Sequence, residues 1–118
     1  MALHQETGRR GEQLAEAYLV SEGFAILHRN WRHSRYEIDL IATKDNILHF
    51  IEVKTRRNIN FGMPEENVDA RKLEHVMAAA DEFLYQNPQW NIVQYDVLSI
   101  TLGKDDHAEF FLIEDVYL

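Results

Sequence analysis

The chain has 118 residues and a mass of 13.9 kDa, the length of a single domain spanning residues 1–118. Apolar residues make up 46% and charged residues 27%, which excludes wholesale disorder and a fibrous repeat, and the lack of cysteine excludes disulfides, thiolate metal sites and a cysteine nucleophile. The formal net charge of −8 argues against a uniformly basic nucleic-acid-binding protein.

The first expected element is an amphipathic helix. Its apolar stripe repeats every 3.6 residues, and Gly23 follows at the position of a C-terminal cap. Gly8 and Gly11 each weaken the helix by ~1 kcal/mol relative to alanine, which predicts close backbone approach near its start. The full set of expected elements is a helix over residues 5–22, strands over 24–32, 36–43 and 47–55, an exposed loop over 56–66, a helix over 68–87, and strands over 92–102 and 108–114.

The order of these elements predicts the fold class. The strands 36–43 and 47–55 flank a turn signal and form a hairpin, and the helix 68–87 has the strongest apolar face in the chain. A three-strand meander with a helix on either side gives an α/β sandwich around a central mixed sheet. The polar N-terminus lacks the apolar core of a signal peptide, and no apolar run reaches the ~18 residues of a membrane span. We therefore expect a cytoplasmic protein with no membrane partner.

Charge is distributed unevenly along the sequence. Residues 1–72 carry 11 basic and 11 acidic residues, whereas residues 73–118 carry one basic and nine acidic residues. An anionic partner would therefore bind to the first part of the chain, and the acidic remainder would face away from that partner.

The strand 47–55 ends in an unusual pair. Alternation places Leu48, Phe50, Glu52 and Lys54 on one face, so a carboxylate and an ammonium lie side by side at the end of a strand that is apolar on both faces. Burying such groups is costly unless they are paired or bind a metal.

The preceding strand supplies a second polar pair, Glu37 and Asp39, and hairpin pairing is expected to bring Asp39 near Glu52 with Lys54 beside them. Two carboxylates held close favour a hard divalent cation, and Mg²⁺ needs only one or two of them plus waters and phosphate oxygens. A neighbouring lysine can orient the attacking water and stabilise developing charge. The alternative is that these strands are half-solvated edges with ordinary polar faces.

Several other polar residues have two interpretations. Arg56 and Arg57 directly follow the pair and are expected to contact phosphate. Arginines at 29, 32 and 35 around Trp31 suit either a nucleic-acid surface or an ordinary exposed strand. Asp96 could support the site from behind or be a satisfied strand carboxylate, and the latter is favoured; the six histidines show no metal-ligand spacing.

Taken together, the motifs resemble those of a known family. They are Gly8-x-x-Gly11-Glu12, Glu37-Ile38-Asp39-Leu40-Ile41, Phe50-Ile51-Glu52-Val53-Lys54-Thr55-Arg56, Phe61-Gly62, Lys72, and Tyr95-Asp96-Val97. In this order they resemble the YraN-type family of bacterial endonuclease-like proteins, which is similar to archaeal Holliday-junction resolvases and to the restriction-endonuclease-like PD-(D/E)xK superfamily. The resemblance covers roughly residues 8–98 and implies a restriction-endonuclease-like α-β-β-β-α-β-β sandwich.

The resemblance also implies roles and a cofactor. Asp39 and Glu52 match metal ligands, with the Val53 carbonyl as a further ligand to Mg²⁺ or Mn²⁺. Lys54 matches the catalytic lysine, Glu12 the first-helix glutamate that completes the site, and Lys72 a lysine of the second helix that faces the same cleft.

Two positions depart from the family pattern. Tyr36 stands where glycine is usual, and Gln94 stands where arginine is common. The first change adds a ring that could stack on a base, and the second removes a potential hydrogen bond to phosphate.

Two functional hypotheses follow. The first is an endonuclease that cleaves DNA, with structured or junction DNA favoured; cutting a junction symmetrically would call for a homodimer. The second is a non-catalytic nucleic-acid-binding or protein-interaction module that keeps the nuclease fold. The intact carboxylate–lysine set favours the first, and the acidic net charge favours the second.

Overall fold

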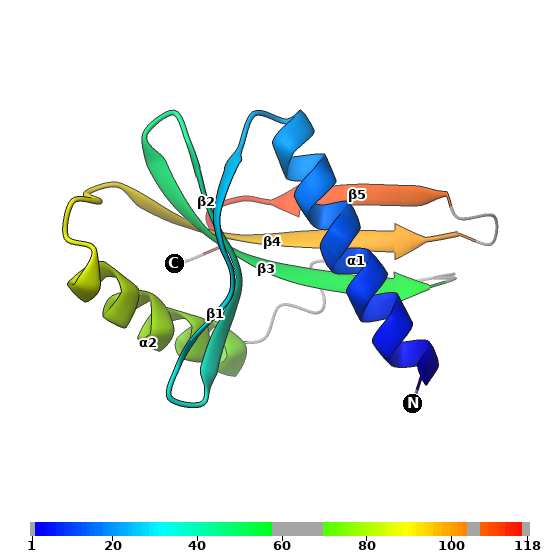
Figure 1. Ribbon diagram of the computed structural model, residues 1–118, viewed down its shortest axis with the longest axis horizontal. Helices are drawn as coiled ribbons and strands as arrows, with labels where there is room; N and C mark the ends of the chain where they lie inside the picture. The colour runs from blue at the N-terminus through cyan, green and yellow to red at the C-terminus, as the bar shows by residue number, and fades with distance from the viewer. Residues whose placement is uncertain (1, 58–69, 104–106, 117–118) are drawn as a thin grey trace.

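A computed structural model describes residues 2–57, 70–103 and 107–116, with side chains from residue 9 onward and excluding that of residue 70. These residues form two helices and five strands in the expected order (Figure 1). The elements are α1 (Ala2–Ser21), β1 (Ala25–His33), β2 (Tyr36–Lys44), β3 (Ile47–Arg57), α2 (Ala70–Gln86), β4 (Val93–Leu102) and β5 (Ala108–Ile113). The expected loop residues 58–66 and the first two residues expected in the second helix lie outside the described residues.

The five strands form one mixed sheet in the order β1-β2-β3-β4-β5. The pairs β1–β2, β2–β3 and β4–β5 are antiparallel, whereas β3 and β4 run parallel. A parallel pair requires a crossover connection, and α2 lies within that connection. The prediction of an α/β fold with a mixed sheet is confirmed.

Each face of the sheet has its own apolar core. Figure 1 shows α1 crossing the sheet near β3, β4 and β5, with α2 beside the β1–β2 hairpin. Fully buried residues on the α1 side include Ala15, Leu19, Leu40, Ile51 and Leu98, and those on the α2 side include Ile38, Ile41, Leu48, Phe50 and Phe83. Because both faces of β3 are covered, a polar side chain on this strand must find a partner within the fold.

Local signals set the ends of both helices. Gly23 has φ +98° and follows α1, with its N–H bonded to the Val20 carbonyl while the Phe24 N–H bonds to the Leu19 carbonyl. This pair of bonds is a Schellman motif, which confirms the cap expected at Gly23. The helix α2 ends at Gln86, immediately before Asn87-Pro88.

Strand β3 is longer than expected. Arg56 and Arg57 continue it and pair with Thr101 and Leu102 of β4, so the prediction of a loop from residue 56 is wrong for these two residues. These two residues are polar because β3 runs past the apolar core. Their backbones still pair with β4 there. Among the described residues, neither helix is long and apolar enough to cross a membrane.

The helix α1 comes very close to the sheet at Gly11. A Cβ at this position would lie 1.9 Å from Thr55 Oγ1 and 2.8 Å from Thr55 Cβ. The close approach expected near the start of the helix is therefore present at Gly11. It holds α1 against β3.

We expect Gly11→Ala to destabilise the protein by about 1–3 kcal/mol, because overpacking against Thr55 outweighs the ~1 kcal/mol gain in helix propensity. Urea unfolding measures the change. Thr55→Ala removes two of the clashing atoms, so the double variant should lose less stability than the two single variants predict by addition. Strict additivity would mean that this contact is not the cause.

Candidate functional site

The site begins where the pairing of β2 with β3 stops. The last paired residues are Leu40 and Ile51, and just beyond them Asp39 Oδ2 accepts a hydrogen bond of 2.8 Å from the Val53 N–H. The Asp39 carboxylate thus accepts the hydrogen bond that a backbone carbonyl of β2 would accept if the pairing continued. Because the N–H and C=O of one strand residue point to the same side, the Val53 carbonyl also faces the β2 side.

Glu52 and Lys72 form an ion pair between β3 and α2. Glu52 is only 8% exposed, and the ammonium of Lys72 contacts its Oε2. Strand alternation directs Glu52 toward α2, on the face that carries Leu48 and Phe50. Lys72 lies in the first turn of α2, so the helix places its ammonium above the end of β3.

Asp39 and Glu52 line one surface hollow with a volume of about 180 Å³. The chain thus brings the two predicted carboxylates together on the α2 side of the sheet. The complete lining is Arg35, Tyr36, Glu37, Asp39, Glu52, Lys72, His75 and Val76.

Charge interactions connect these groups. Burial and the negative charge of Glu52 raise the pKa of Asp39 to about 7, against the opposing effects of the Val53 hydrogen bond and Lys72. Burial, together with the hydrogen bond and charge of Lys72, lowers the pKa of Lys54. Burial acts to lower the pKa of Lys72 as well, but the hydrogen bond and charge of Glu52, together with Lys54 and the charge of Asp39, raise the pKa overall. Two carboxylates and two ammonium groups therefore act on one another at the end of β3.

The remaining predicted residues are placed less centrally. Glu12 is half-buried on α1, next to the Gly11–Thr55 contact; among the described residues no hydrogen bond or ion pair joins it to Asp39 or Glu52. Arg56 is partly buried, with a buried Nε that has no hydrogen-bond partner among the described residues, and Arg57 is exposed. The structure thus groups Asp39, Glu52, Lys54 and Lys72, and leaves the role of Glu12 a prediction.

Three further residues of the hollow contact one another, and of these His75 was not assigned a role from the sequence. Tyr36 stacks on His75 with ring centroids 4.7 Å apart, and the Arg35 guanidinium lies 5.7 Å from the Tyr36 ring centroid. His75 follows Lys72 by three residues, a spacing that puts both on one helix face and could have revealed it. Of the other arginines near Trp31, Arg29 pairs with Glu16 and Arg32 with Glu37, as an ordinary exposed strand would have them.

The donor set can be compared with the needs of a divalent cation. The described residues contain no group of three or more His, Asp or Glu side chains able to hold a metal. Mg²⁺ commonly takes one or two carboxylates and completes its shell with water and phosphate oxygens. Asp39 and Glu52 repel each other, and together they provide the two carboxylates that Mg²⁺ needs. The Val53 carbonyl lies on the same side as Asp39.

Comparison with known proteins places the chain among relatives of similar length. The model of "Uncharacterised protein family UPF0102" matches residues 11–100. A UPF0102 protein of Chloroherpeton thalassium is 41% identical over 118 residues, covering 93% of this chain and 92% of the relative. Another from Bacteroides thetaiotaomicron is 42% identical over 117 residues, covering 99% and 96%. A third from Dictyoglomus thermophilum is 39% identical over 102 residues, covering 86% of each chain.

Proposed function

The chain belongs to the UPF0102 family, the YraN-type family that its motifs resemble, and we propose that it is a metal-dependent endonuclease that hydrolyses phosphodiester bonds of DNA. The observation that carries this proposal is the convergence of Asp39 and Glu52 in one hollow, with the ammonium of Lys72 on Glu52. A structural role alone would not require two carboxylates to be held together at an energetic cost.

In this proposal the sheet and helices form a restriction-endonuclease-like sandwich, and Asp39, Glu52 and the Val53 carbonyl hold Mg²⁺ or Mn²⁺. When bound, the ion would neutralise phosphate charge and lower the pKa of a water molecule. Glu52 would have to share its oxygen with the ion or give up Lys72. Release of Lys72 would leave its ammonium next to the substrate phosphate.

The two lysines have distinct proposed roles. Lys54 lies on β3 beside both carboxylates, where its ammonium orients the attacking water and stabilises the negative charge that develops on phosphate. Lys72 reaches the same place from α2 and binds phosphate. Glu12 is proposed, on the resemblance alone, to complete the site from α1.

DNA would approach along the end of β3. Arg56 continues the face of Glu52 and Lys54, and its partly buried guanidinium is suited to a phosphate oxygen. Arg57 and Lys72 add positive charge. Structured DNA is the proposed substrate class, and paired cuts in a symmetric junction would be made by a homodimer.

The direct test is a cleavage panel of single-stranded, duplex, flap and four-way DNA with Mn²⁺ or with EDTA. We expect cleavage with Mn²⁺ and none with EDTA, together with metal binding that Asp39→Ala abolishes. Metal-independent cutting, or metal binding that survives in Asp39→Ala, would count against the assignment.

Lys72→Ala and Arg56→Ala should weaken DNA binding without sequence preference. Each should reduce the slope of log K against log salt by about one unit for every phosphate that the protein no longer neutralises. Affinity measured at several salt concentrations gives that slope. Lys44→Ala is the matched control, because it removes one positive charge from a residue that does not line this hollow. An equal effect in all three variants would show only non-specific attraction.

The second candidate function is a non-catalytic module, and one observation favours it. Asp39 and Glu52 already have partners within the chain, namely the Val53 N–H and the Lys72 ammonium. In such a module these contacts only satisfy the two carboxylates within the fold. The cleavage panel separates the two functions, since a module binds DNA or protein without cutting in Mn²⁺.

A further inference from the structure

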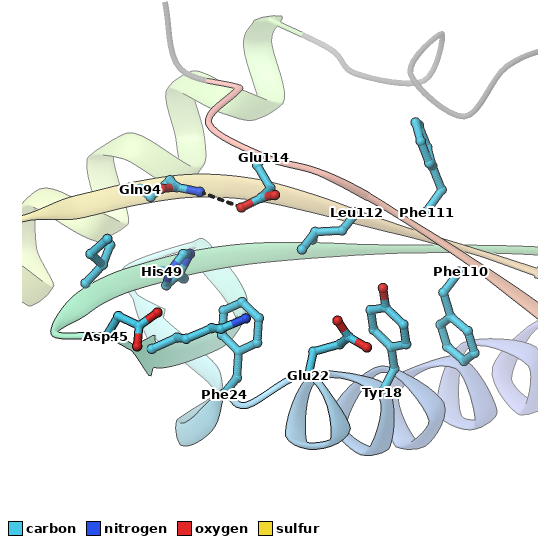
Figure 2. A pocket seen from close by; sticks show the side chains of 12 residues that line it. Tyr18, Glu22, Phe24, Asp45, His49, Gln94, Phe110, Phe111, Leu112 and Glu114 are labelled. Atoms are coloured by element: carbon cyan, nitrogen blue, oxygen red, sulfur yellow. Dashed lines mark hydrogen bonds between the residues drawn. The ribbon is translucent and has the colours of Figure 1, made fainter.

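A second and larger cavity lies on the other face of the sheet. Its volume is about 480 Å³, and it is formed by the C-terminal end of α1, the β2–β3 turn and strands β3, β4 and β5 (Figure 2). His49 lines it from β3, three residues before Glu52, so the two side chains face opposite sides of the sheet. The cavity is therefore separate from the proposed nuclease site.

The histidine on the wall of this cavity is held in one orientation. His49 is 4% exposed, and its Nδ1 lies 2.7 Å from Asp96 Oδ2. Asp96 Oδ1 accepts two more hydrogen bonds, from Gln94 Nε2 at 3.0 Å and from the Asp115 N–H at 2.9 Å. Because a carboxylate can only accept, the geometry assigns a proton to Nδ1, and in the tautomer protonated at Nδ1 alone Nε2 is an acceptor. The bond to Asp96 is the one side-chain hydrogen bond that His49 makes among the described residues.

Carboxylates surround the rest of the opening. Figure 2 shows Glu22 beside Tyr18 on α1, and Glu114 across the cavity next to Gln94. Burial and the negative charges of Glu22 and Glu114 raise the pKa of the Tyr18 hydroxyl. Asp45 adds a third carboxylate to the lining.

Two donor side chains of the cavity already make contacts within the chain. The ammonium of Lys44 lies 5.1 Å from the centroid of the Phe24 ring. The amide of Gln94 donates to Asp96 and, at 3.3 Å, to Glu114. Apart from the Tyr18 hydroxyl, the polar groups that the cavity offers a ligand are mainly acceptors.

Aromatic rings form the walls between these polar groups. Tyr18 and Phe110 stack with centroids 4.5 Å apart and planes 7° apart, and Phe24 meets His49 edge-on at 4.9 Å. Flat apolar walls with acceptors between them suit a planar cation that donates several hydrogen bonds.

We propose that this cavity binds an organic guanidinium cation, which donates to His49 Nε2 and to the carboxylates of Glu22 and Glu114. The guanidinium could belong to a small metabolite or to an arginine side chain of a protein partner; the recognising chemistry is the same. This site is independent of the proposed nuclease activity, because His49 and the cavity that it lines are on the opposite face of the sheet from Glu52.

The test uses phenylguanidinium as the probe and phenylurea as its neutral analogue of the same shape. Two-dimensional NMR of the ¹⁵N-labelled full chain follows the His49 ring nitrogens and the backbone near Gln94. Phenylguanidinium should shift these signals in a saturable way, and phenylurea should bind at least about tenfold more weakly.

Variants on the rim keep the core intact. Glu22→Gln and Glu114→Gln should each weaken phenylguanidinium binding by about three- to tenfold, and the double variant should lose it in the measurable range. Glu109→Gln is the matched control, since Glu109 is an exposed acid of β5 that does not line the cavity. It should bind as the wild type does.

The source of the cation is resolved by a second pair of probes, agmatine and the blocked peptide acetyl-Ala-Arg-Ala-amide. Tighter binding of the peptide assigns the site to an arginine of a protein partner, and tighter binding of agmatine assigns it to a free metabolite. Equal binding of phenylguanidinium and phenylurea, or unchanged affinity in the double variant, would overturn the proposal whatever the outcome of the cleavage experiments.

Discussion

Glu52→Gln should lower Mn²⁺-dependent cleavage by at least about 100-fold. Loss of a residue that only hydrogen-bonds to a metal ligand typically lowers metal affinity or activity about 10- to 100-fold, and Glu52 is itself a proposed ligand. The substitution keeps the shape of a side chain that is only 8% exposed. It also frees the ammonium of Lys72 from its ion pair. DNA binding should therefore persist or tighten while metal affinity falls.

Side-by-side measurement of Mn²⁺ affinity, DNA affinity and cleavage rate checks this result. Glu37→Gln is the matched control, since Glu37 also lines the hollow but pairs with Arg32 at 3.5 Å. It removes one negative charge from the same place and should retain most of the cleavage rate. If Glu52→Gln cleaves as fast as the wild type, Glu52 is not a metal ligand.

The stability of the metal-free protein should fall as pH rises from about 4 to about 8, and Asp39 should be a main cause. Burial and the charge of Glu52 raise the pKa of Asp39 from its ordinary value of 3.8 to about 7. The folded state thus binds this proton more tightly than the unfolded state does. Its contribution to stability is full below pH 4 and is lost as pH rises through 7, by up to about 4 kcal/mol.

Asp39→Asn removes this titration and keeps an oxygen that can accept from the Val53 N–H. In EDTA the variant should match the wild type near pH 4 and exceed its free energy of unfolding by about 2–4 kcal/mol at pH 8. Urea unfolding across this range measures the difference. Saturating Mn²⁺ at pH 8 should stabilise the wild type and leave the variant unchanged. If the free energy of unfolding changes with pH in the same way for both proteins, the pKa of Asp39 is not raised in the folded state.

Local pattern predicted most of the fold. The apolar stripe of α2, the cap at Gly23 and the alternation in β3 each depend on residues a few positions apart, and all three are present. The same alternation placed Glu52 toward α2 and made a shared site with Asp39 a reasonable expectation. The polar end of β3 misled the prediction because polarity alone cannot separate a loop from a strand that extends past the core.

Contacts set by the parallel pairing could not be predicted. His49 and Asp96 are 47 residues apart and meet only because β3 pairs with β4 in the register that sets His49 opposite Gln94. No local periodicity contains that register. The second cavity has the same origin, since it needs α1, the β2–β3 turn and β5 to be in place at once.

The parallel pairing of β3 with β4 also bears on the order of folding. The strands β1, β2 and β3 pair across short turns. The pairing of β3 with β4 joins residues far apart in the sequence, and such contacts form more slowly. The bond between Asp39 and Val53 spans 14 residues within the meander, but Lys72 belongs to the crossover. During synthesis the ribosome releases Asp39 and Glu52 before the lysine that neutralises Glu52. We expect the nascent β1–β2–β3 meander to remain unpacked around Glu52 until α2 has been synthesised. The complete site would then form only after the whole domain has folded.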